Sequence, residues 1–187
     1  MEFLKSPIEN EPEMLRLLGL ITARWAAAEH QMALLLGQVL GDDDSAIQVY
    51  YALGAFRSRQ QLVLTLVRSA EISNLQLSKF TEFHKRASER TLEKLGKLWN
   101  TRNDYMHSPY VSGEKKGDIS LRKIRPTAPA ASGDFRVHTN ELTTHANRVY
   151  QMTLRLYAIN NRNGLRQIHD AKGGLNWMRY GYRRDEQ

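Results

Sequence analysis

The chain of 187 residues has no cysteine, no hydrophobic run of membrane-spanning length and no basic-then-apolar signal sequence at its start. Without cysteine it can form neither a disulfide framework nor a thiolate metal site, and it has no cysteine nucleophile. A spanning helix needs about 20 apolar residues, so we expect no membrane association and a cytoplasmic location. The sequence also lacks internal repeats, a P-loop, a dinucleotide-binding fingerprint and zinc-ligand spacing, and we therefore expect no cofactor and no metal site.

Basic residues exceed acidic ones, with 27 Lys and Arg against 20 Asp and Glu and a formal net charge of +7. Such an excess can attract a polyanion, although a need for surface solubility explains it equally well. A chain of this length is sufficient for one buried core and short for two. We therefore predict a single domain over residues 1–187.

Hydrophobic residues recur every three or four positions in several stretches, which is the spacing of one face of a helix. The strongest stripe ends near Gly41 and consists of Met14, Leu18, Ile21, Trp25, Ala28, Met32, Leu35 and Val39. Similar stripes predict helices over about 77–106 and 139–160. Two shorter helices are expected between them and the first, one over about 47–56 and one after a capping-box pattern at Ser58 and Gln61. We predict a mainly α fold, an antiparallel bundle of four to five helices.

The pattern changes after Pro109. Residues alternate between apolar and polar on both sides of a glycine-bounded turn, and this predicts an inserted β-hairpin arm over about 109–138. The arm carries the basic residues that we consider for RNA binding: Lys115, Lys116, Arg122, Lys123 and Arg125. A solvated hairpin, or one that contacts a second protomer, fits the same pattern. The tail, about 161–187, is basic and aromatic, and could either stack nucleic-acid bases or pack on the bundle.

The stretch that joins the long helix to the arm carries the residues with the most evident chemistry. Arg102 continues the apolar stripe of the helix, and a buried guanidinium needs an anionic partner or ligand. Pro109 should end the helix near His107, the only side chain in this stretch that titrates near neutral pH. A chain that leaves the helix there could bring the imidazole back beside the guanidinium. Simpler interpretations are an ion pair of Arg102 with Glu29 or Asp104, and a helix-capping role for His107.

The order of Arg102, Asn103 and His107, with four residues between arginine and histidine, resembles the signature of the HEPN superfamily. This resemblance implies a helical bundle that acts as a homodimer and cleaves RNA without a metal, through attack of the 2′-hydroxyl on the adjacent phosphate. In such a site Arg102 would bind the phosphate, His107 would act as general acid or base, and Asn103 would orient the imidazole or a phosphate oxygen. The site would also contain three secondary residues that support Arg102, Asn103 and His107, namely Asp104, Tyr110 and Glu29. Many such proteins are toxins or act in phage defence, so an antitoxin or defence-system partner is also implied.

The sequence departs from the family in one respect. Some HEPN toxins carry a tyrosine two residues after the histidine that a partner enzyme modifies, whereas here that position is Pro109 and the tyrosine is Tyr110. A catalytically inactive HEPN-like module that binds RNA, a nucleotide or a protein partner is the main alternative. A purely structural helical subunit is the second.

Overall fold

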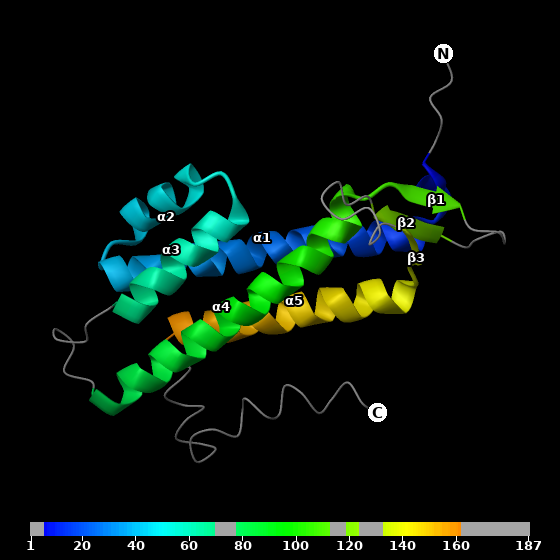
Figure 1. Ribbon diagram of the computed structural model, residues 1–187. Helices are drawn as coiled ribbons and strands as arrows, with labels where there is room; N and C mark the ends of the chain where they lie inside the picture. Colours follow the sequence, from blue (N-terminus) through cyan, green and yellow to red (C-terminus); the bar gives the residue numbers. More distant parts are fainter. Residues whose placement is uncertain (1–5, 70–77, 113–118, 124–132, 162–187) are drawn as a thin grey trace. The chain divides into compact units, whose positions relative to one another are not determined.

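The structure is a computed structural model that describes residues 6–69, 78–112, 119–123 and 133–161 (Figure 1). The elements in these ranges, in chain order, are η1 (Pro7–Asn10), α1 (Pro12–Leu40), α2 (Asp43–Ala52), α3 (Phe56–Ser69), α4 (Ser78–His107), β1 (Tyr110–Ser112), β2 (Ile119–Lys123), β3 (Gly133–Arg136) and α5 (Thr139–Asn160). The predicted mainly α fold with a β insertion after the long helix is confirmed.

The chain divides into two compact units, whose boundaries fall inside α1, α4 and α5. The first unit comprises Met1–Ala26 and Lys97–Tyr150, and the second comprises Ala27–Gly96 and Gln151–Gln187. The end of α4, which carries Arg102 and His107, belongs to the first unit together with the whole sheet. The prediction of a single domain is not tested by this division and stays a prediction.

Helix α1 buries most of the stripe that the sequence predicts, although Leu18 and Val39 are only partly buried. Ile21, Ala28, Met32 and Leu35 are at most 1% exposed. The helix is followed by Gly41 with a φ of 79°, a left-handed conformation in which its N–H donates to the carbonyl of Gly37. Glycine adopts this conformation without the steric cost that a Cβ imposes.

Two glycine substitutions test this helix end. Gly41→Ala is expected to lower the free energy of unfolding by about 1 kcal/mol, because alanine is strained at positive φ. Gly19→Ala, at an exposed position inside α1 with nothing within 4 Å of the added Cβ, should raise it by about 0.5–1 kcal/mol. Urea denaturation of both variants measures the two shifts, and shifts of the same sign would contradict the assigned helix end.

The sheet of the first unit is antiparallel in the order β1-β2-β3. Ile119 and Leu121 of β2 are buried, while the intervening Ser120 and the following Arg122 are not. The buried residues join a core cluster with α1 and α5 that consists of Ile8, Met14, Leu17, Ile21, Ile119, Leu121, Val137, Leu142 and Ala146. The buried face of β2 is therefore part of the core of this unit, while Arg122 on the same strand is exposed.

In the second unit α2 begins before the apolar stripe that predicts it, after a possible N-cap in the run from Asp42 to Ser45, and α3 begins before the cap that the sequence predicts. Asp42 is the N-cap of α2, since its carboxylate accepts from the backbone N–H groups of Asp44 and Ser45. Helix α3 begins at Phe56, two residues before the expected cap Ser58, and the N–H of Arg59 donates to the carbonyl of Ala55. The predicted capping box at Ser58 is therefore wrong.

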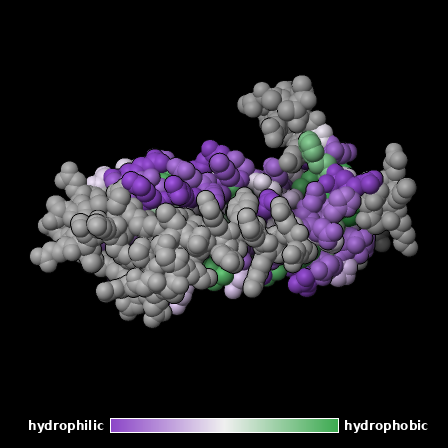
Figure 2. Space-filling model, turned by 90° about the horizontal axis from the view of Figure 1, so that it is seen from below, coloured by the Kyte–Doolittle hydropathy of each residue, from purple (hydrophilic) through white to green (hydrophobic). Residues whose placement is uncertain are grey.

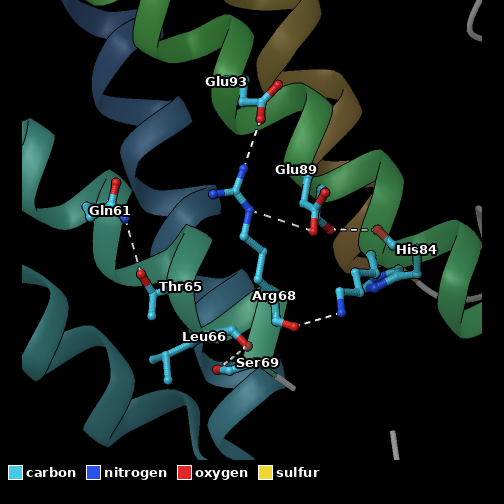
Figure 3. Close-up of polar contacts among 10 residues, drawn as sticks. Gln61, Thr65, Leu66, Arg68, Ser69, His84, Glu89 and Glu93 are labelled. Carbon is cyan, nitrogen blue, oxygen red and sulfur yellow. Dashed lines mark hydrogen bonds and ion pairs between the residues drawn. The ribbon is translucent and has the colours of Figure 1, made fainter. Parts of the chain in front are cut away.

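Polar contacts join α3 to α4 within the second unit (Figure 3). Arg68 Nη2 lies 3.0 Å from Glu93 Oε1, and its Nε lies 3.9 Å from Glu89 Oε1. Lys85 Nζ donates to the carbonyl of Arg68 at 2.7 Å, which satisfies an acceptor in the last turn of α3. Ion pairs at the surface add little to the free energy of unfolding, so the main effect of these contacts is to position the end of α3 next to α4.

Hydrophilic side chains cover most of the surface that the described residues contribute to the face in Figure 2. The large hydrophobic side chains that remain exposed are distributed over several elements: Leu15, Leu40, Val49, Tyr51, Phe135, Tyr150, Leu154 and Tyr157. Among the described helices, none combines the length and hydrophobicity needed to cross a bilayer.

Candidate functional site

Arg102 and His107 meet at the C-terminal end of α4. Arg102 Nη1 lies 3.5 Å from His107 Nε2. His107 is the last residue of the helix, and the Ser108 N–H still donates to the carbonyl of Asp104 at 3.1 Å. His107 is thus at the final helical turn, as the sequence predicts, and its side chain approaches Arg102 without the chain having to leave the helix first. A guanidinium cannot accept a hydrogen bond, so the contact is a hydrogen bond only when Nε2 carries a lone pair.

Trp99 packs against the guanidinium of Arg102. Its Cζ lies 5.1 Å from the centre of the Trp99 ring, one turn earlier on α4. Trp99 in turn packs against the buried Trp25 of α1, with ring centres 5.3 Å apart and planes inclined by 42°. A cation over an indole face is stabilised by the ring quadrupole. Sequence reasoning assigned no role to Trp99, although a tryptophan three residues before the arginine lies on the same helix face.

Tyr105 and Tyr110 complete the helix end. The Tyr110 hydroxyl donates to the backbone carbonyl of Tyr105 at 2.8 Å. Burial raises the pKa of both phenols above the usual value, since a phenolate would be desolvated there. Tyr105 packs edge to face on His145 of α5, with ring centres 5.3 Å apart. Tyr110 is therefore a neutral donor at physiological pH.

His145 is buried, and sequence reasoning gave it no specific role. Burial lowers its pKa to about 4, with a further contribution from the positive charge of Arg148. Among the described residues, no hydrogen-bond partner is placed at its Nε2. A buried neutral histidine opposes protonation, so the folded state becomes less stable as pH falls.

The pH dependence of unfolding tests the burial of His145. Its folded pKa lies below the unfolded value of 6.5, so its contribution is complete above pH 6.5 and is lost as pH falls towards 4. The loss should reach about 3 kcal/mol. His145→Leu should flatten this part of the profile, whereas His138→Leu, at an exposed position, should leave it unchanged. Equal profiles for wild type and His145→Leu would contradict the assignment.

The other candidate site residues belong to different units of the chain. Asn103 is exposed beside Arg102, and Asp104 is half-buried. Glu29 belongs to the second unit, where its Oε1 lies 2.9 Å from Arg59 Nη1 with both side chains mostly buried. Arg59 also donates to the carbonyl of Leu53 at 2.7 Å. Glu29 therefore has a structural partner in α3.

The candidate RNA-binding residues are only partly described. Arg122 is exposed on β2 but makes two hydrogen bonds to Asp134 of β3, at 2.9 and 3.1 Å. That carboxylate offsets its charge and raises its pKa through the hydrogen bonds. Lys123 lies in β2, but its side chain is outside the described residues. Also outside them are Lys115, Lys116, Arg125 and the tail.

Among the described residues, no group of three His, Asp or Glu side chains is placed to bind a metal ion. Comparisons of the chain with family models, with curated proteins and with solved structures find no match. The geometry at the end of α4 is therefore the basis for any functional assignment.

Proposed function

We propose that the protein is a metal-independent endoribonuclease of the HEPN type. The observation that carries the proposal is the 3.5 Å approach of Arg102 Nη1 to His107 Nε2 at the end of α4. Both belong to the Arg-Asn-x3-His pattern that resembles the family signature, and Asn103, the residue after Arg102, is exposed. The support is thus a sequence pattern together with a side-chain arrangement that suits it.

The paired groups match what cleavage by the 2′-hydroxyl requires. The attack transfers a proton from the hydroxyl, builds negative charge on the phosphoryl oxygens and needs a proton for the leaving 5′-oxygen. The planar guanidinium of Arg102 can donate two hydrogen bonds to the phosphate. His107 is exposed at the helix end, where it can exchange a proton with substrate or water.

The resemblance also implies the biological setting. We propose that two copies associate and bring their Arg102 and His107 pairs to one composite site, and that the protein acts as a toxin or in phage defence with an antitoxin or defence-system partner. Sedimentation of the purified protein tests the dimer, and a monomer that cleaves RNA would contradict the composite site.

RNA cleavage in EDTA tests the proposal. Wild type, an Arg102→Ala/His107→Ala variant and a matched Arg90→Ala/His30→Ala variant are incubated with total RNA. The control removes the same two residue types from exposed positions on α4 and α1. We expect cleavage by the wild type and the control alone. Equal cleavage by all three would place the activity elsewhere.

A catalytically inactive HEPN-like module that binds RNA, a nucleotide or a protein partner is the alternative. It predicts intact RNA in the same incubation together with salt-dependent binding, since phosphate contacts release counterions. If the wild type neither cleaves nor binds RNA, the second alternative, a purely structural helical subunit, is favoured.

A further inference from the structure

The chain just after α4 lacks one backbone hydrogen-bond donor, because residue 109 is proline. In an α-helix each carbonyl accepts from the N–H four residues later. The carbonyl of Asp104 has this bond, from Ser108. The next carbonyl, that of Tyr105, would be paired with residue 109, but Pro109 has no N–H. The turn that carries His107 would therefore be left with an open acceptor.

The Tyr110 hydroxyl occupies the position of the missing donor. It donates to the Tyr105 carbonyl at 2.8 Å. The Tyr110 ring packs against the core cluster of the first unit, so its position is fixed independently of the helix. The backbone on either side is also held, because the carbonyl of Pro109 accepts from the N–H of Arg122 at 2.9 Å and Tyr110 pairs with Leu121 in the sheet.

We propose that Tyr110 is a positioning residue for His107, because its hydroxyl supplies the bond that Pro109 cannot and so fixes the last turn of α4. The carbonyl that it holds is two residues before His107, whose imidazole must stay close to Arg102. The catalytic consequence rests on the proposed ribonuclease function, whereas the effect on the helix end does not. The same bond engages the Tyr110 hydroxyl within the fold, a structural role distinct from that of the modified tyrosine of some HEPN toxins.

Tyr110→Phe removes only this hydroxyl, and Tyr157→Phe, at a site that is 56% exposed on α5, is its matched control. The ring proton resonances of His107, assigned by their loss in His107→Gln, report its surroundings without any need for activity. We expect these resonances to shift in Tyr110→Phe. We also expect kcat to fall about tenfold with little change in KM, because a small misplacement of a reacting group costs rate and not binding. Tyr157→Phe should match the wild type in both measurements.

A rescue variant separates this role from general packing. Pro109→Ala/Tyr110→Phe returns a backbone N–H at position 109, and should move the His107 resonances and kcat back towards wild-type values. Unchanged resonances in Tyr110→Phe would overturn the inference, as would the lack of any recovery in the rescue variant. If the wild type does not cleave RNA, the proposed function fails, while the resonances still decide the positioning role.

Discussion

Replacement of His107 by glutamine is expected to slow RNA cleavage by about 10²–10⁴-fold, the usual contribution of a positioned general acid or base. Glutamine can still donate and accept hydrogen bonds near Arg102, but it cannot transfer a proton at neutral pH. His107 is exposed, so the substitution should leave the fold and the free energy of unfolding nearly unchanged. Single-turnover rate constants with an end-labelled RNA measure the effect directly.

His138→Gln is the matched control, because His138 is also exposed and lies just before α5. It should cleave at the wild-type rate. A loss of less than about threefold in His107→Gln would be far below the effect of removing a general acid or base. In that case His107 would serve as a helix-capping residue or a phosphate ligand and not in proton transfer.

Leu121→Ala is expected to lower the free energy of unfolding by about 2–5 kcal/mol. Leu121 is 1% exposed and belongs to the same core cluster as Leu17 and Ile21 of α1. Its truncation removes buried methyl groups and leaves a cavity that the surrounding side chains can fill only in part. Because this cluster also contacts Tyr105 and Met106, the loss should weaken the helix end that carries His107.

Urea denaturation of Leu121→Ala and Arg122→Ala measures this contribution. Arg122 is the next residue on β2, but its side chain is 54% exposed on the opposite face, so its removal should change stability much less. A loss for Leu121→Ala below about 1 kcal/mol would contradict the packing of the sheet in the core.

The sequence was sufficient to predict the helices and the sheet where periodicity is strong. The buried residues of α5, from Leu142 to Ile159, follow the predicted stripe, and alternation in β2 predicted its buried Ile119 and Leu121. The start of α3 was missed because the Ser58 and Gln61 pattern indicates a cap, whereas the helix already begins before Ser58. A local pattern of this kind does not fix where a helix begins, and Phe56, the first residue of α3, is buried.

The sequence pointed to Arg102 and His107, whose side chains lie close together in the structure, but it did not indicate the side chains that surround them. The spacing of Arg102 and His107 indicated the pair, but the route by which they approach depends on side-chain conformations at the helix end. The contacts of Trp99 with Trp25 and of Tyr105 with His145 join residues far apart in the sequence. No local pattern encodes such pairs, because they arise only when the helices pack.

Comparison of two RNAs of the same sequence, one natural and one fully 2′-O-methylated, tests whether the protein cleaves RNA through attack of the 2′-hydroxyl. In EDTA the wild type should cleave only the natural RNA and leave 2′,3′-cyclic phosphate ends, since the methylated RNA has no 2′-hydroxyl to attack. The Arg102→Ala/His107→Ala variant should cleave neither. Cleavage of the methylated RNA, ends that carry a 3′-hydroxyl, or intact natural RNA after incubation with the wild type would each contradict the account.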